Sequence, residues 1–376
     1  MENKAAIVIG AGIVGLATAR ALALKGYAVK VFERSKPAVG ASVRNFGMVW
    51  PIGQPEGKLY DRAKRSRQIW KETCEAAGIW HEAAGSLHLA YHSDEMKVLT
   101  ELSEQFASQG RAVSLLGPAE IIEKYDAVNT ENLLGGLYSS EEMIVDPREA
   151  IAKIPGYFSS QFGIEFFWGK CVSYISDQTV YIGNEEEHTA DIIFVCSGAD
   201  FETLYPEIFS SIPITKCKLQ MMRLVSQPDG WRMGTSLCGG LSLIHYNSFK
   251  TAPSLHELKE RYQKEKNDYL DWGIHVMVSQ NGKGELTVGD SHEYGLTFDP
   301  FDKQFINEMI LDYLKDFTRF KDYSLLESWN GIYPKLTNGD TEVLISPEAG
   351  VYILNGLGGA GMTLSFGLAE EVVASI

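Results

Sequence analysis

The chain opens with apolar runs separated by a glycine-rich turn and a helical pattern. Residues 6–9 form a continuous apolar run that is typical of a buried strand. The sequence Gly-Ala-Gly-Ile-Val-Gly follows at 10–15 and leads into a helical pattern over 16–25. A second apolar run covers 28–32 and ends at Glu33. This order predicts a βαβ unit with two parallel strands.

The glycines of the first turn have the spacing G-x-G-x-x-G, with an acid about 20 residues further on. Gly10 permits the tight turn, Gly12 lets the backbone approach a pyrophosphate, and Gly15 lets the helix pack on the strand. The helix N-terminus offers N–H groups to the phosphates, and Glu33 can accept hydrogen bonds from ribose hydroxyls. The pattern predicts a dinucleotide site; the alternative is a glycine-rich turn in another βαβ unit, with Glu33 a solvated carboxylate.

Further elements follow from periodicity and from turn residues. Helices are expected over 57–78, 94–109, 118–125, 147–161 and 301–319, and strands over 85–91, 135–138, 164–168 and 191–198, the last ending in small residues. Pro155-Gly156 is expected to kink or shorten its helix. Alternating runs at 218–225, 239–246, 273–278 and 285–290 predict an antiparallel sheet.

These patterns predict a mixed α/β protein, α+β overall. A Rossmann-type nucleotide domain, expected over 1–84, 140–214 and 325–376, is interleaved with a mainly antiparallel second domain over 85–139 and 215–324. A chain of 376 residues is long enough for two domains.

A second glycine-rich loop follows the apolar run at 351–355. Its sequence, Gly-Leu-Gly-Gly-Ala-Gly-Met-Thr at 356–363, leads into a helix over 364–374. The loop would bring another helix N-terminus to a cofactor, for example where negative charge develops on an isoalloxazine ring. The alternative is a generic turn with close helix packing.

Charge and cysteine content narrow the class of protein. The net charge of −15 argues against nucleic-acid partners and anionic membrane surfaces. The five cysteines form no C-x-x-C motif, so reduced thiols and a cytoplasmic location are expected. No integral membrane segment is expected, because residues 5–24 are better explained by the strand and helix of the first motif.

Several motifs together resemble a known family. The motifs are residues 10–15 together with Glu33-Arg34, residues 40–47, Asp146-Pro147, residues 196–199, Trp329-Asn330-Gly331 and residues 356–363. In this order they resemble the FAD-dependent amine and amino-acid oxidases of the D-amino acid oxidase, glycine oxidase and sarcosine oxidase type. The resemblance implies an FAD domain and a substrate domain whose sheet covers the flavin. It also implies hydride transfer from a small-molecule amine, hydrolysis of the imine, and oxygen or another electron acceptor.

A finer resemblance concerns the runs 41–55, 217–223, 239–241, 289–295 and 361–369. They are similar to a bacterial clade proposed to oxidise aminophosphonates related to 2-aminoethylphosphonate. Amino-acid oxidases of the wider family usually have Arg in W-x-G-x-R-P, whereas this chain has Tyr333 there. An ordinary α-amino acid is therefore a less suitable substrate. Non-covalent FAD is expected, because no Cys follows Cys238 and no His lies between Arg34 and His81.

The resemblance assigns roles to individual residues. Cofactor contacts are expected at Gly10, Gly12, Ile13, Val14, Gly15, Glu33, Arg34, Ser42, Arg44, Asn45, Phe46, Gly47, Met48, Cys171, Val172, Cys196, Ser197, Gly198, Ala199, Gly331, Gly356, Gly358, Gly359, Ala360, Gly361, Met362 and Thr363. Substrate contacts are expected at Arg44, Arg223, Tyr246, Lys335 and Thr363, and catalytic contacts at Tyr333, His245 and His292. No spacing typical of a metal site is evident, so no metal is expected.

A surface or structural role is the alternative for several of these residues. Arg44 and Arg223 could be surface residues, Val172 a plain strand residue, Tyr333 a packing residue, and the histidines structural. At the level of function, the alternatives are an NAD-dependent dehydrogenase, a flavoprotein that only binds or transfers electrons, and an oxidase or dehydrogenase of glycine, sarcosine or a D-amino acid.

Overall fold

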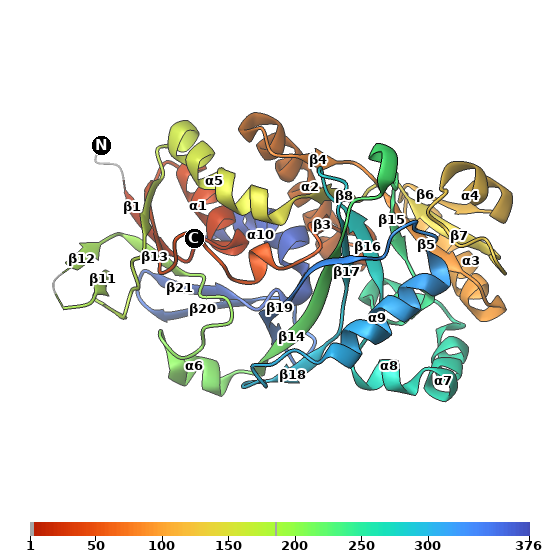
Figure 1. Ribbon diagram of the computed structural model, residues 1–376. Coiled ribbons are helices and arrows are strands. Elements are labelled where there is room, and N and C mark those ends of the chain that lie inside the picture. The colour runs from red at the N-terminus through yellow and green to blue at the C-terminus, as the bar shows by residue number, and fades with distance from the viewer. Residues whose placement is uncertain (1–3, 185) are drawn as a thin grey trace.

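The computed structural model describes residues 4–184 and 186–376, and Figure 1 shows two large sheets joined along the middle of the molecule. The first has six strands in the order β20-β21-β13-β1-β2-β9. Its strands are β1 Ala5–Ile9, β2 Ala28–Glu33, β9 Glu165–Trp168, β13 Ile192–Val195, β20 Val343–Glu348 and β21 Val351–Asn355. All pairings are parallel except that of β20 with β21. The predicted βαβ unit is confirmed.

Both faces of this sheet are buried, which explains its continuous apolar runs. Along β1, Ala6 and Val8 belong to one core cluster, whereas Ile7 and Ile9 belong to another. Helices contribute to the first cluster: α1 Ile13–Leu24, α2 Lys58–Ala77, α5 Pro147–Phe162 and α10 Gly361–Ala374. Helix α5 continues to Phe162, so the expected interruption at Pro155-Gly156 is wrong.

The second sheet has nine strands in the order β18-β14-β17-β16-β15-β5-β7-β6, with β19 also paired to β14. The strands are β5 Ser86–Ala90, β6 Val113–Leu116, β7 Gly135–Ser139, β14 Ile214–Leu224, β15 Ser236–Cys238, β16 Met277–Gln280, β17 Leu286–Gly289, β18 Glu293–Gly295 and β19 Leu325–Leu336. The pairings are antiparallel except that of β15 with β5, so the expected antiparallel sheet is confirmed. Although β19 lies within 325–376, it runs beside β14 in this sheet.

Shorter elements complete the described chain. The remaining helices are α3 Ser93–Ser108, α4 Pro118–Lys124, α6 Pro206–Ser211, α7 Leu255–Glu265, α8 Asn267–Asp271 and α9 Gln304–Phe317. One small sheet contains β3 Met48–Val49, β4 His81–Glu82 and β8 Met143–Val145. Another contains β10 Tyr174–Ser176, β11 Thr179–Ile182 and β12 Glu186–Thr189. The described helices include none with both the length and the hydropathy needed to span a membrane.

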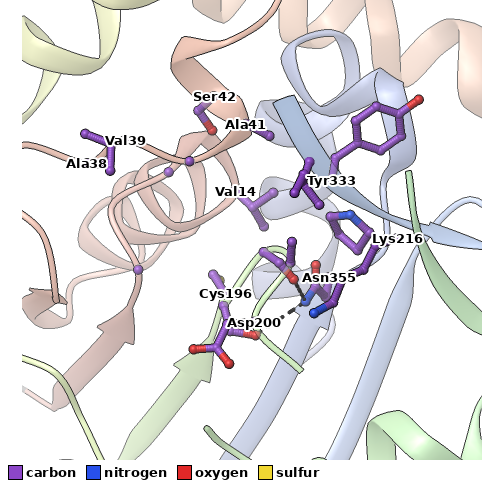
Figure 2. A pocket seen from close by; sticks show the side chains of 18 of the residues that line it. Val14, Ala38, Val39, Ala41, Ser42, Cys196, Asp200, Lys216, Tyr333 and Asn355 are labelled. Carbon is purple, nitrogen blue, oxygen red and sulfur yellow. Dashed lines mark hydrogen bonds between the residues drawn. The ribbon is translucent and has the colours of Figure 1, made fainter. Parts of the chain in front are cut away.

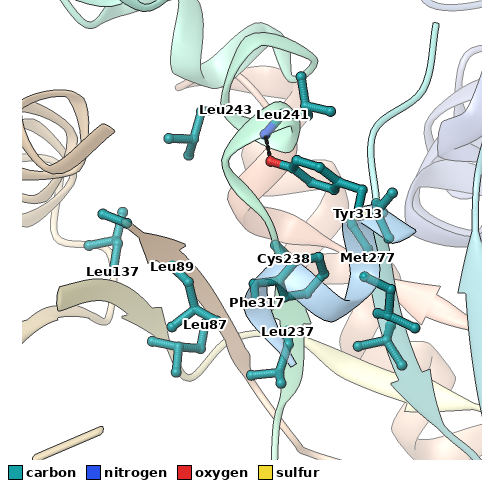
Figure 3. Packing of buried hydrophobic residues seen from close by; sticks show 14 of the residues in the cluster. Leu87, Leu89, Leu137, Leu237, Cys238, Leu241, Leu243, Met277, Tyr313 and Phe317 are labelled. Atoms are coloured by element: carbon teal, nitrogen blue, oxygen red, sulfur yellow. Dashed lines mark hydrogen bonds between the residues drawn. The ribbon is translucent and has the colours of Figure 1, made fainter. Parts of the chain in front are cut away.

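The segment 239–246 does not form the expected strand. It contains the 3-10 helix η4, Gly240–Ile244, which packs in the large core shown in Figure 3. Its turn is held by the Tyr313 hydroxyl, which accepts the backbone N–H of Leu241 at 2.9 Å. A Cβ at Gly239 would lie 2.7 Å from the Tyr313 ring, so glycine permits this close approach. The alternation of leucines here reflects burial on successive sides of a tight helix.

Candidate functional site

Two cavities share a wall beside the carboxyl ends of the parallel strands. The first has a volume of about 820 Å³ and is lined by the ends of β1, β2, β13 and β21 (Figure 2). The second has a volume of about 650 Å³ and extends toward the nine-stranded sheet. Ile13, Ser42, Arg44 and Tyr333 line both. Ligand sites in open α/β sheets lie in this position.

The first glycine loop forms the backbone surface that the spacing predicts. Gly10 has φ +103°, and a Cβ there would lie 2.4 Å from the carbonyl oxygen of Cys196. A Cβ at Gly15 would lie 1.8 Å from the carbonyl oxygen of Gly10, so the helix packs directly on the loop. Gly12 is the N-cap of α1 and lines the first cavity. The loop thus fits the phosphates of a dinucleotide at a helix N-terminus.

Glu33 is held beside this loop. Its carboxylate accepts the backbone N–H groups of Ala11 and Ser35, both at 2.9 Å. Arg34 pairs with Asp200 at 2.6 Å. This ion pair joins the residue after β2 to the loop after β13, and both residues line the first cavity. A strand-end carboxylate in this place fits a ribose, as the sequence predicts.

The segment 41–47 connects the two cavities. The hydroxyl of Ser42 accepts the N–H of Ile13 at 2.9 Å, close to the start of α1. The amide of Asn45 donates to the carbonyls of Ala41 and Ser42 and accepts the N–H of Gly47 at 2.8 Å. These bonds fix a loop that passes from the phosphate region to the second cavity.

The second glycine loop also lies at the junction of the cavities. It contains η6, Gly358–Ala360, and leads into α10. Asn355 donates to the carbonyl of Gly198 at 2.9 Å, which ties this loop to the end of β13. The Thr363 hydroxyl accepts the N–H of Trp50 at 3.0 Å. Two helix N-termini and two glycine loops therefore converge on one elongated space, which an extended dinucleotide fits.

The second cavity is lined by aromatic and ionisable side chains from β19 and the neighbouring strands. Tyr333 is buried beside Cys217, and burial holds the pKa of its phenol well above the usual value. Lys335 donates to the hydroxyl of Tyr294 at 3.0 Å. The Tyr246 hydroxyl lies 3.0 Å from the sulfur of Met277. A neutral phenol and an ammonium thus occupy the same wall.

Three histidines gather in this cavity: His245, His275 and His292. One nitrogen from each lies within 4.8 Å of the others. Burial is the main cause that lowers the pKa of His292 to about 4 and those of His245 and His275 well below the usual value. Sequence reasoning missed His275 and expected no metal site, because the three residues come from distant segments with no motif spacing.

Nearly all of the residues singled out from the sequence line one or both cavities. Three do not: Gly15 and Gly47 support the loops by close packing, and Arg223 lies outside both cavities. Arg223 donates to Glu285 and Thr287 and lies over the Trp329 ring. Acidic and hydroxyl partners on neighbouring strands therefore hold Arg223 away from both cavities, and its expected contact with substrate stays an untested prediction.

Comparison with known proteins agrees with this geometry. The DAO family, described as FAD dependent oxidoreductase, matches residues 5–375. Glycine oxidase from Bacillus cereus ATCC 14579 superposes with a TM-score of 0.77 at 16% identity, over 99% of this chain and 94% of that chain. Iminodiacetate oxidase from Chelativorans sp. BNC1 gives a TM-score of 0.72 at 20% identity, over 99% and 94%. These two structural similarities show that the chain has the same fold as these proteins.

A curated relative is similar over part of the chain. The tRNA 5-methylaminomethyl-2-thiouridine biosynthesis bifunctional protein MnmC of Pseudomonas aeruginosa (strain UCBPP-PA14) is 25% identical over 262 residues. The similarity covers 63% of this chain and 36% of that protein. The chain thus spans about a third of the length of the curated relatives it matches.

Proposed function

The chain belongs to the family of FAD-dependent oxidoreductases, and we propose that it oxidises a small amine of the aminophosphonate class, related to 2-aminoethylphosphonate. In this proposal FAD is held without a covalent bond along the first cavity and the shared wall. The amine occupies the second cavity. The segments 1–84, 140–214 and 325–376 supply most of the cofactor site, and 85–139 and 215–324 most of the cover over the substrate.

The position of Lys335 carries the proposal. Tyr333 stands where the resemblance expects an arginine that clamps a carboxylate, and Lys335 follows two residues later on the same face of β19. The site therefore has a cation, displaced along the strand from the expected position. In 2-aminoethylphosphonate the anionic group is one bond further from the amine than in an α-amino acid, which suits a displaced cation.

The surroundings of Lys335 favour an anion with several oxygens. Its ammonium retains donors beyond the one given to Tyr294, and it is a compact charge of the kind that binds phosphate. Tyr333 is neutral at physiological pH and lines the same wall, so its hydroxyl can donate. Phosphonate oxygens could accept from both groups.

Bound FAD supplies the acceptor for a hydride from the carbon that carries the amine. The chain contributes orientation and a cavity in which a neutral amine is favoured over an ammonium. The apolar groups of Phe46, Met48 and Met277 line that cavity. After the amine loses a hydride and a proton, water converts the imine to an aldehyde and ammonia.

One observation supports a different substrate class. Arg44 also lines the second cavity, and its guanidinium donates to the carbonyl of Asn330 at 3.2 Å. Its remaining donors could hold the carboxylate of glycine, sarcosine or a D-amino acid. Arg44 thus makes an amino-acid oxidase or dehydrogenase the second candidate.

Steady-state turnover tests the proposal. Oxygen uptake and reduction of an artificial electron acceptor would be followed with 2-aminoethylphosphonate, its 1-hydroxy form, glycine, sarcosine and D-alanine, and the aldehyde product would be trapped. The expected result is turnover of an aminophosphonate with release of an aldehyde. Turnover of an amino acid alone would favour the second candidate, and no turnover of any amine would contradict both.

A further inference from the structure

The cluster of His245, His275 and His292 has features that the proposed oxidation does not use. The centroids of His245 and His275 are 3.7 Å apart, and each lies 5.1 Å from the centroid of His292. A shared partner would satisfy the unpaired nitrogens of this cluster, because unpaired buried polar groups cost free energy.

The hydrogen bonds of the cluster leave nitrogens free. His292 Nδ1 lies 2.9 Å from the carbonyl oxygen of Gly273, which can only accept, so Nδ1 carries the proton and Nε2 has a free lone pair. Within the described residues, both nitrogens of His275 lack a hydrogen-bond partner. His275 is only 4% exposed, so bulk water does not readily satisfy them.

A buried carboxylate stands beside the cluster. Oδ1 of Asp290 is 3.3 Å from Nε2 of His275 and has no hydrogen-bond partner in the part of the chain that the structure describes. Asp290 is 5% exposed. The Asp290 oxygen is placed to accept the Nε2–H of His275 while Nδ1 binds a cation, as in carboxylate–histidine–metal arrangements.

We propose that His245, His275 and His292 form a binding site for one divalent transition-metal cation of the zinc type. Three neutral imidazoles with a carboxylate behind one of them are a donor set that suits such cations. A tetrahedral centre with bonds of about 2.0–2.1 Å needs nitrogens about 3.4 Å apart. The nitrogens are within 4.8 Å of one another, and the two 5.1 Å centroid distances suit such a centre, whereas the His245 and His275 rings must move apart from 3.7 Å for all three nitrogens to reach one cation. His245 is the least enclosed of the three, so its ring is the one placed to make this movement.

Three protein ligands leave a fourth position open. All three histidines line the second cavity, so that position is accessible to water or to an anionic group bound there. A divalent cation in this cavity would add to the charge of Lys335, and together they would more than offset the two negative charges of a phosphonate. The metal site itself does not depend on which amine the protein oxidises.

Zinc binding tests the site without any turnover. The FAD-loaded protein would be stripped with a chelator, desalted, mixed with Zn²⁺ and desalted again, and the retained zinc and flavin measured per chain. One zinc per chain is expected. His245→Ala removes the least enclosed ligand, and His292→Asn removes Nε2 while an amide donor remains for the Gly273 carbonyl. Each substitution is expected to weaken zinc binding by at least about tenfold. Loss of a group that only hydrogen-bonds to a metal ligand already costs about 10–100-fold in affinity, so loss of a ligand should cost at least as much.

His256→Ala is the matched control, since that histidine is exposed on α7 outside both cavities. It is expected to retain zinc as the wild type does. A wild-type readout that needs no variant is the ¹⁵N spectrum of labelled histidine, in which zinc should shift three of the eight imidazoles. The proposal is overturned if the wild type retains no zinc, if all variants retain it equally, or if zinc leaves these three imidazoles unshifted. None of these outcomes bears on amine oxidation.

Discussion

The ammonium of Lys335 and the hydroxyl of Tyr294 lie 3.0 Å apart across strand β14. Lys335 is on β19 and Tyr294 on β18, and both strands pair with β14. Tyr294 and Tyr333 are both in register with Cys217. Three strands therefore fix the cation and the two phenols relative to one another. In the proposed function, this arrangement binds the anionic group of the substrate.

Lys335→Met is expected to raise KM for an aminophosphonate by at least about tenfold. A hydrogen bond to a charged group is worth about 1.5–3 kcal/mol, and the methionine keeps the length of the side chain. Tyr294→Phe should have a smaller effect, of about fivefold, because it removes one neutral partner. Lys264→Met, at an exposed position on α7, is the control and should leave KM unchanged. Equal KM values for Lys335→Met and the wild type would refute the anion site.

Gly15→Ala is expected to abolish retention of FAD. The added Cβ would lie 1.8 Å from the carbonyl oxygen of Gly10, so the loop or α1 must shift. Flavin per chain after gel filtration and the thermal midpoint would be measured. Gly156→Ala is the control: this exposed glycine of α5 has open space around the new methyl group. It should retain FAD and gain about 0.5–1 kcal/mol of stability. Full flavin content in Gly15→Ala would contradict the role of the loop.

Glu33→Ala is expected to weaken FAD binding by about tenfold, a loss of about 1.4 kcal/mol. The substitution removes the acceptor for the N–H groups of Ala11 and Ser35 as well as the proposed ribose contact. Glu165→Ala is the control, because Glu165 is exposed on the neighbouring strand β9. The dissociation constant would be measured from flavin fluorescence on reconstitution. If both variants bind FAD alike, Glu33 does not contact the cofactor.

Ionisation of Glu142 should make a contribution that lowers protein stability as the pH rises from about 4.5 to about 7. Burial raises the pKa of Glu142 from 4.5 to about 7, and the side chain is fully buried. In this window the Glu142 carboxyl binds more protons in the folded protein than in the unfolded chain, so its contribution to stability is lost as the pH rises. The shift corresponds to about 3 kcal/mol.

Glu142→Gln isolates this effect. The amide oxygen can still accept the N–H of Ile52, which the carboxylate accepts at 3.0 Å. Denaturant unfolding at a series of pH values would be compared with the wild type. The variant should lack the fall in stability between pH 4.5 and 7 that Glu142 causes. The same pH dependence in both proteins would show that Glu142 ionises normally.

Local sequence signals predicted the first motif well, because strand, turn and helix lie close in the chain. The glycine spacing also located the two glycine loops that line the cavities. The strand predicted over 239–246 was wrong. The apolar alternation of this segment suits a strand, whereas tertiary packing against Tyr313 selects a tight helix. When a short segment is buried on all sides, the spacing of its apolar residues no longer distinguishes a strand from a helix.

Side-chain position along a strand was harder to predict. Arg223 lies on the same face of β14 as Leu219 but four residues further on, which is about 14 Å along a strand. That distance takes it beyond the second cavity to Glu285. The histidine cluster was missed for a related reason: His275 and His292 meet through the pairing of distant segments, and His245 arrives from η4.

The most direct test of the account is an anaerobic titration of the purified protein, followed by the absorbance of its bound flavin. The ligands would be 2-aminoethylphosphonate, its 1-hydroxy form, glycine, sarcosine and D-alanine. The account predicts bleaching of the flavin by an aminophosphonate and little bleaching by the amino acids. Bleaching by an amino acid alone would contradict the proposed substrate class and would transfer the anion-binding role from Lys335 to Arg44.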